Sequence, residues 1–197
     1  MTAAAGVGWQ AARVLSLALH PFVAFTTLAL VAAWRLEPAS LPRTALGIGV
    51  VVAVFWGFVV QRQRSGRWGT VDASRRRERP AMYALALLLS GGYWLWMGGR
   101  ASAASAGVLA AVAMLCVAGL ANRWIKLSLH MASSAFAGVV LLGLLPAAGI
   151  AALLLLPALA WARLRMARHD LGEVLGGCML GLAMGALLSW QPAGQLA

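Results

Sequence analysis

The sequence predicts an all-α fold: a polytopic transmembrane helix bundle of six or seven spans, in a single integral membrane domain covering residues 1–197. Composition is the first evidence, because 62% of the residues are hydrophobic, only 11% are charged and the mean hydropathy is +0.83. This balance excludes a disordered chain and leaves too few charges to cover a soluble domain. The second observation is a series of long apolar segments, and the third is the gathering of charges between them.

Seven apolar segments meet or approach the length of about 20 residues that a helix needs to cross a bilayer. They cover about residues 12–35, 44–62, 81–98, 102–121, 127–145, 147–163 and 171–190. His20-Pro21 interrupts the first segment, which predicts an interfacial helix before Pro21 and a span from near Phe22 to Trp34. Pro157 predicts a kink in the sixth segment. The sequence leaves six and seven spans both open.

The basic residues predict the orientation and the partners of the chain. Lys and Arg number 16 against five Asp and Glu, for a net charge of +11. With seven spans, all but Arg35, Arg43 and Arg100 fall on one side, which the positive-inside rule makes cytosolic. We therefore expect a multi-pass protein of the inner cell membrane with its polar loops at the cytosolic face. Because these charges sit in short loops, anionic lipid head groups or phosphate are the expected partners, and nucleic acid is not.

Cysteines and acids give no sign of a disulfide framework or a metal site. Cys116 and Cys178 lie in apolar stretches and are expected to be buried as small hydrophobic residues. The five acids are not spaced like the ligands of an Asp-rich metal site. We expect neither a cofactor nor a metal.

Three polar clusters each open an apolar segment, and two membrane crossings separate one from the next. They cover residues 72–80, 126–130 and 163–173. All three are therefore expected at one membrane face, each at a helix N-terminus, where amide groups and partial positive charge favour an anion. Guanidinium groups add paired donors for phosphate oxygens. The arrangement predicts a phosphate-binding site.

Two histidines in these clusters indicate a reaction. Glu173 follows His169 by four residues, so on one helical face its carboxylate accepts from one ring nitrogen and leaves the other as a nucleophile. His130 then serves as the acid for the leaving oxygen. Plainer interpretations stay open, since a basic residue at a span end is usually a topology anchor. Under this interpretation His20 is a structural residue. The arginines interpreted as topology anchors are Arg62, Arg64, Arg67, Arg75, Arg76, Arg77 and Arg123.

These residues resemble the motifs of the phosphatidic acid phosphatase type 2 superfamily, which includes lipid phosphatases, polyprenyl-pyrophosphate phosphatases, glucose-6-phosphatase and vanadium haloperoxidases. The family motifs are Lys-x6-Arg-Pro, Pro-Ser-Gly-His and Ser-Arg-x5-His-x3-Asp. Counterparts occur here in the same order, as Asp72-x6-Arg79-Pro80, Leu127-Ser128-Leu129-His130 and Ala162-Arg163-x5-His169-x3-Glu173. The resemblance covers about residues 72–185.

The resemblance implies a metal-independent membrane phosphatase that hydrolyses a lipid phosphate or a (poly)prenyl pyrophosphate through a phosphohistidine. The resemblance implies that His169 is the nucleophile and that Glu173 orients its ring. It implies that His130 is the acid that protonates the leaving group. The residues implied to bind phosphate are Arg79, Arg163 and Ser128. Asp72 stands where the family has lysine, so Lys126, or one of Arg75 to Arg77, is expected to supply that charge. The family often faces its site away from the cytosol, whereas the loop charges here predict the cytosolic face.

Two other functions stay open on the sequence, a Mg²⁺-dependent membrane prenyl- or alcohol-phosphate transferase and a non-catalytic lipid-binding relative. The last segment carries glycines at overlapping four-residue spacings, namely Gly172, Gly176, Gly177, Gly181 and Gly185. Small residues let helices approach closely in lipid. The stripe therefore predicts support for His169, ordinary packing between spans, or the contact face of a homo-oligomer.

Overall fold

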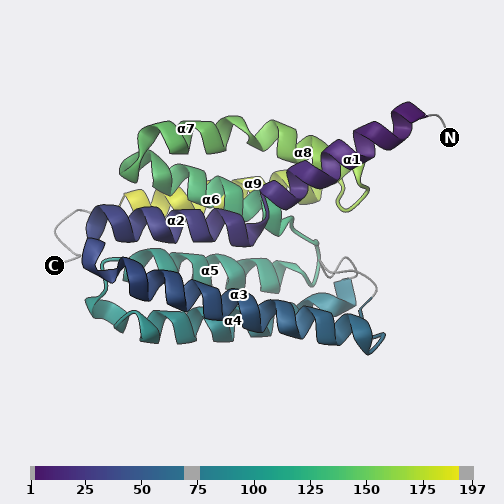
Figure 1. Cartoon of the computed structure of the whole chain (residues 1–197). Coiled ribbons are helices and arrows are strands. Elements are labelled where there is room, and N and C mark those ends of the chain that lie inside the picture. The colour runs from purple at the N-terminus through teal and green to yellow at the C-terminus, as the bar shows by residue number, and fades with distance from the viewer. Residues whose placement is uncertain (1–2, 69–75, 191–197) are drawn as a thin grey trace. The chain divides into compact units, whose positions relative to one another are not determined.

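The computed structural model describes residues 3–68 and 76–190, and every regular element in these ranges is a helix (Figure 1). Asp72 and Arg75 lie outside the described residues. The long helices are α1 (Ala3–Ala18), α2 (Pro21–Leu36), α3 (Leu41–Arg64), α4 (Arg79–Trp96), α5 (Ser105–Ala121), α6 (Leu129–Leu144), α7 (Pro146–Leu154), α8 (Leu156–Arg165) and α9 (Leu171–Ser189). Short 3₁₀ turns form η1 (Pro38–Ser40), η2 (Arg76–Glu78) and η3 (Gly99–Ala101).

Both predicted interruptions by proline are confirmed. The first apolar segment is divided into α1 and α2, and α2 begins at Pro21. The sixth segment is divided into α7 and α8 at Leu155, with Pro157 in the first turn of α8. Proline lacks an amide hydrogen and is tolerated in the first helical turn, so each break falls just before a proline.

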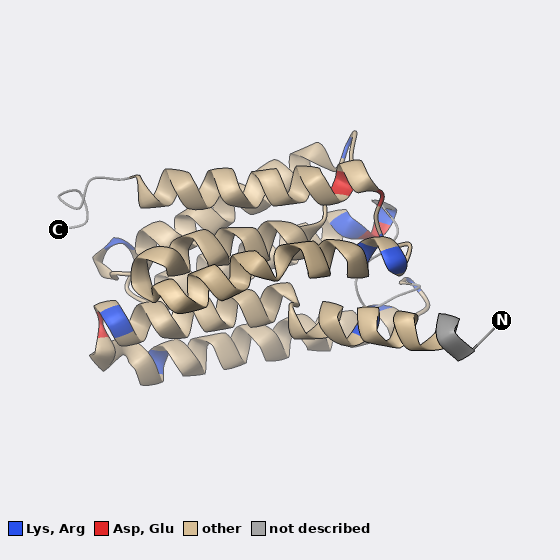
Figure 2. Ribbon diagram, turned by 90° about the horizontal axis from the view of Figure 1, so that it is seen from above, with Lys and Arg blue, Asp and Glu red and all other residues tan. Residues whose placement is uncertain are grey.

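Four stretches are long and apolar enough to cross a membrane, which gives the chain the character of a membrane protein. They are Gly6–Leu36, Pro38–Arg64, Pro146–Arg165 and Leu171–Ser189. The helices Ser105–Ala121 and Leu129–Leu144 are apolar but shorter. Most of the charged residues lie near helix ends (Figure 2). A count of six or seven spans stays a prediction.

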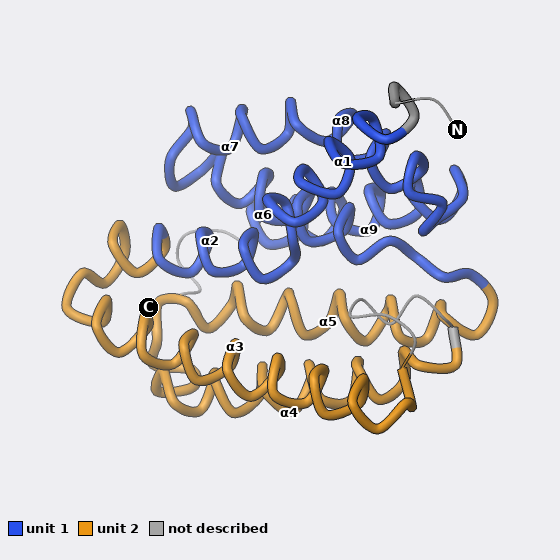
Figure 3. The backbone as a smooth tube through the Cα atoms, turned by 45° about the vertical axis from the view of Figure 1, so that its right-hand side comes forward, with its two compact units in different colours: residues 1–31, 125–195, 197 blue, residues 32–124, 196 orange. Residues whose placement is uncertain are grey.

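The chain forms two compact units, shown in different colours in Figure 3. The first contains α1, the part of α2 up to Val31, and helices α6 to α9. The second contains the rest of α2, from Ala32, together with α3, α4 and α5.

Helix α6 is the central element of the first unit. Ten of its 16 residues are buried, among them Ser133, Ser134 and Phe136. A helix buried on most of its faces belongs to a core and not to a surface. Its residues Met131 and Ala135 pack with Leu156 and Leu159 of α8 and with Val174 of α9.

Helix α9 approaches α6 closely along three of the glycines in its stripe. A Cβ atom at Gly177 or Gly181 would collide with the backbone oxygen of Ser128 or Ala132, respectively. At Gly185 it would lie 2.8 Å from Cβ of Val139. The structure therefore assigns these three glycines to packing within the chain, and they offer no free face for a homo-oligomer.

In the second unit, α3 packs against α4, and α4 against α5. Gly47 of α3 lies so close to α4 that a Cβ there would be 2.9 Å from the indole of Trp96. Trp94 of α4 donates from Nε1 to Oγ of Ser105 in α5 at 2.8 Å. Trp68, which follows α3, joins a core cluster with Val59.

The glycine contact yields a stability prediction. We expect Gly181→Ala to cost about 2 kcal/mol of stability, because the added methyl group forces α6 and α9 apart. Gly143→Ala in α6 is the matched control, since no atom lies within 4 Å of a Cβ there. Melting temperatures of the purified variants in detergent would test this, and equal effects at both positions would contradict the close approach.

Candidate functional site

An imidazole–carboxylate pair stands at the beginning of α9. Nδ1 of His169 lies 2.8 Å from Oε2 of Glu173, and the His169 side chain is only 1% exposed. A carboxylate only accepts hydrogen bonds, so Nδ1 carries the proton, and the lone pair of the neutral ring is on Nε2. This is the arrangement expected of an oriented histidine nucleophile or base.

The pair forms by a different local geometry from the one expected. Helix α9 begins at Leu171, with Asp170 as its N-cap, so His169 lies outside the helix and not on its face. Oδ1 of Asp170 accepts from the Glu173 amide at 2.8 Å, and Oε2 of Glu173 receives the Asp170 amide at 3.4 Å. This reciprocal capping box turns the Glu173 carboxylate back toward His169. The spacing of Asp170 and Glu173 was the sequence signal for it.

Lys126 and Ser128 join this pair from the segment that precedes α6. Nζ of Lys126 donates to the carbonyl oxygen of Arg168 at 2.8 Å and lies 3.6 Å from Oε2 of Glu173. The amide of Ser128 donates to the carbonyl oxygen of Glu173 at 3.0 Å. The beginnings of α6 and α9 are therefore held together by both backbone and side-chain contacts.

Ser128 carries an unsatisfied hydroxyl. It is the N-cap of α6 but makes no side-chain capping bond, and it is completely buried. Its Oγ has no hydrogen-bond partner within the described part of the chain. An unmade bond of this kind costs about 1–3 kcal/mol. A buried hydroxyl at a helix N-terminus suits a site that receives an anion.

The loop that presents His169 is closed by a Schellman motif at the end of α8. The amides of Ala167 and Arg168 donate to the carbonyl oxygens of Leu164 and Arg163 at 2.9 and 3.2 Å. The motif requires a left-handed residue, and Ala167 adopts it with φ of 52°. Glycine normally takes this position, because alanine is strained there.

His130 occupies the first turn of α6, as predicted, and its ring has a neighbour that sequence reasoning missed. The ring of His20 meets that of His130 edge-on, with centroids 5.0 Å apart. Nδ1 of His20 accepts from the Phe22 amide at 3.3 Å, so the proton of a neutral His20 ring is on Nε2. The position of His20 directly before Pro21 indicated the beginning of a helix, but no local sequence pattern indicated that His20 contacts His130.

The two predicted phosphate-binding arginines lie in different units. Arg163 is 3% exposed in the last turn of α8, and its Nη1 donates to Oγ of Ser16 in α1 at 2.8 Å. Arg79 is the first residue of α4, in the second unit, and is 4% exposed. The contacts described above join Lys126 and Ser128 to the His169–Glu173 pair. Arg79 and Arg163 are buried at their own helix ends.

Comparison with protein-family models, curated proteins and solved structures finds no match to this chain. Among the described residues, no three His, Cys, Asp or Glu side chains lie together in a way that could hold a metal ion. A functional assignment therefore depends on the residues and geometry of the site.

The left-handed Ala167 yields a second stability prediction. At the end of α3 the equivalent position is Gly66, with φ of 68° and no atom within 4 Å of a Cβ. We expect Ala167→Gly to stabilise the protein and Gly66→Ala to destabilise it, each by about 0.5–1 kcal/mol, because only glycine adopts this conformation without strain. Melting temperatures would test this, and shifts of the same sign would contradict it.

Proposed function

We propose that this chain is a metal-independent membrane phosphatase that hydrolyses a lipid phosphate or a (poly)prenyl pyrophosphate through a phosphohistidine. The observation that carries the proposal is the enclosed pair of His169 and Glu173. Lys126 lies 3.6 Å from the Glu173 carboxylate, and the Ser128 amide donates to the Glu173 carbonyl oxygen. The hydroxyl of Ser128 has no partner among the described residues. The motif resemblance to the phosphatidic acid phosphatase type 2 superfamily supports the same chemistry.

In the proposed reaction, Nε2 of His169 attacks the phosphorus atom, and the bond from phosphorus to the lipid oxygen breaks. His130 gives its proton to that oxygen, so the lipid leaves as an alcohol or as a shorter phosphate. Glu173 accepts the Nδ1 hydrogen bond throughout and stabilises the positive ring. His130 then takes a proton from water, which attacks the phosphohistidine, and inorganic phosphate leaves with the His169 ring restored.

Phosphate binding in the proposal uses cations and helix N-termini. The hydroxyl of Ser128 and the first amides of α6 donate to phosphate oxygens, since the first amides of a helix have no partner within it. Lys126 and Arg163, both in the first unit, supply positive charge, whereas a phosphate-binding role for Arg79 stays a prediction from the motif resemblance. Lys126 lies beside Glu173 and holds the Arg168 carbonyl, so it also fixes the His169 loop.

Two features of the proposal concern access and location. Because the His169 side chain is only 1% exposed, substrate reaches Nε2 only after neighbouring side chains move. A substrate anchored in the bilayer approaches a site at the head-group level sideways, which gives a membrane scaffold its purpose.

We further propose six or seven spans, an inner-membrane location and a site facing the cytosol, on the strength of the loop charges.

The nucleophile is tested by substitution of the histidine and of its carboxylate partner. We expect His169→Ala to abolish phosphate release from a panel of lipid phosphates, and Glu173→Gln to lower kcat by about 100-fold or more, because a neutral amide no longer stabilises the positive ring. Arg64→Gln, at the exposed end of α3, is the control. Vanadate should compete with substrate.

Three outcomes would decide against the proposal. Activity retained in His169→Ala would exclude this nucleophile. Loss of activity with a chelator would favour the Mg²⁺-dependent transferase. No trapping of labelled phosphate on the wild-type protein, together with no turnover on any substrate of the panel, would favour the non-catalytic lipid-binding relative.

Lys126 is tested separately, because it combines a charge with a loop contact. We expect Lys126→Met to lower kcat/KM by about tenfold or more, through a weaker hold on phosphate and on the Arg168 carbonyl. Lys126→Arg keeps the charge and should retain most of the affinity for substrate, which the KM of the two variants would show. Unchanged phosphate release in Lys126→Met would remove this residue from the site.

A further inference from the structure

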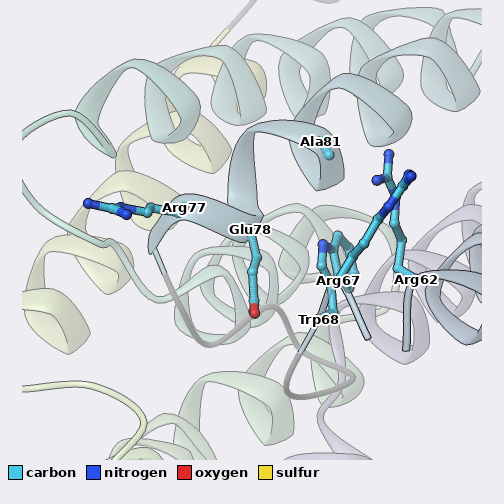
Figure 4. A pocket seen from close by; sticks show the side chains of 6 residues that line it. All are labelled: Arg62, Arg67, Trp68, Arg77, Glu78 and Ala81. Carbon is cyan, nitrogen blue, oxygen red and sulfur yellow. The ribbon is translucent and has the colours of Figure 1, made fainter. Parts of the chain in front are cut away.

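A second concentration of arginine lies in the second unit, around a pocket of about 320 Å³ (Figure 4). The end of α3, the turn after it, η2 and the first turn of α4 form its walls. The lining residues are Arg62, Arg67, Trp68, Arg77, Glu78 and Ala81. The lining includes three arginines and one glutamate, and in Figure 4 the side chain of Arg77 points away from those of Arg62 and Arg67. We call it the arginine pocket.

The end of α3 builds one wall of the arginine pocket. Gly66 takes the left-handed position of a Schellman motif, and the chain then reverses onto the last turn of the helix. The carbonyl oxygen of Arg62 accepts from the amides of Arg67 and Trp68 at 3.0 and 3.2 Å. The backbone itself therefore brings Arg67 and Trp68 next to Arg62. In Figure 4 the side chains of Arg62 and Arg67 extend toward Ala81.

Two arginines of the arginine pocket form no ion pair with a described carboxylate, although Glu78 lines the same pocket. In the part of the chain that the structure describes, neither Arg62 nor Arg67 is within ion-pair distance of a carboxylate. The guanidinium of Arg62 lies 4.9 Å from the centre of the Phe58 ring, and its buried Nε makes no hydrogen bond with a described residue. Neighbouring guanidinium groups repel each other, so an anion between them relieves the repulsion and satisfies their donors.

The floor of the arginine pocket is apolar and well packed. Trp68 is 6% exposed, and its ring meets that of Phe58 edge-on, with centroids 5.6 Å apart. Val59 and Met82 belong to the same core cluster. Cationic walls above an aromatic floor match a phosphate group attached to an apolar body better than they match a fully hydrated ion.

We propose that the arginine pocket binds a phosphate-bearing anion, with Arg62 and Arg67 as its principal ligands and Trp68 beneath it. The pocket lies at the end of α3, whose stretch Pro38–Arg64 is long and apolar enough to cross a membrane. The ends of such helices lie at the level of lipid head groups, where the negative charge of anionic phospholipids attracts basic residues. Arg62, Arg67 and Trp68 do not belong to the candidate phosphatase site, so the proposal does not depend on hydrolysis.

Binding to the full-length protein in non-ionic detergent tests the proposal. The probes are short-chain phosphatidylglycerol, short-chain phosphatidylcholine and inorganic phosphate, with native mass spectrometry and calorimetric titration as readouts. We expect the double variant Arg62→Gln/Arg67→Gln to bind phosphatidylglycerol about tenfold or more weakly than wild type. The matched control is Arg64→Gln, whose arginine is exposed at the same helix end and does not line the pocket. It should stay within about twofold of wild type.

The single variant Arg67→Gln, at an exposed position, keeps the test valid if the double variant fails to fold. Binding of phosphatidylglycerol in preference to inorganic phosphate, dependent on Arg62 and Arg67, identifies a lipid head group as the source. Equally dependent binding of inorganic phosphate alone identifies a soluble one. Binding unchanged in both variants, or an equal loss in Arg64→Gln, overturns the proposal. The binding result is judged on the Arg62, Arg67 and Arg64 variants alone, which separates it from the catalytic test at His169.

Discussion

The close approach of α9 to α6 is the constraint on which the rest of the first unit depends. Gly177 and Gly181 remove the side chains that would otherwise separate the two backbones. The Ser128 amide can therefore reach the carbonyl oxygen of Glu173. Because the same residues carry the unsatisfied hydroxyl and the carboxylate, the packing contact and the candidate site are one structure. In lipid, where burial of apolar surface drives association less than in water, such glycine contacts are a principal source of helix packing.

Two local features of the candidate site destabilise the folded protein. Ser128 leaves its hydroxyl without a partner among the described residues, and Ala167 adopts a backbone conformation that suits glycine. Ser128 lies at the beginning of α6, and Ala167 lies in the loop between α8 and His169. Costs of this kind persist where surrounding contacts compel them, and they collect at functional sites. Two contacts offset these costs: the capping box of Asp170 and Glu173, and the hydrogen bond from Lys126 to the carbonyl oxygen of Arg168.

The chain uses one backbone motif for two different results. A Schellman motif ends α3 and another ends α8, and each reverses the chain by the same pair of hydrogen bonds. After α3 the reversal brings Arg67 and Trp68 onto Arg62, which creates a cationic wall with an aromatic neighbour. After α8 it leads the chain to His169 and the beginning of α9. The side chains that come after the motif, and not the motif itself, determine the chemistry.

The sequence by itself determined the helical class, the apolar segments and both proline breaks, because composition and proline chemistry act locally. It also placed His130 and Arg79 at helix beginnings and paired His169 with Glu173. Only the tertiary structure decided that Lys126 and Ser128 contact the beginning of α9, that His20 meets His130, and that Arg62 and Arg67 share a pocket. A contact between distant residues depends on how helices pack and on where a cap turns the chain, and neither can be read from the spacing of residues along one helix.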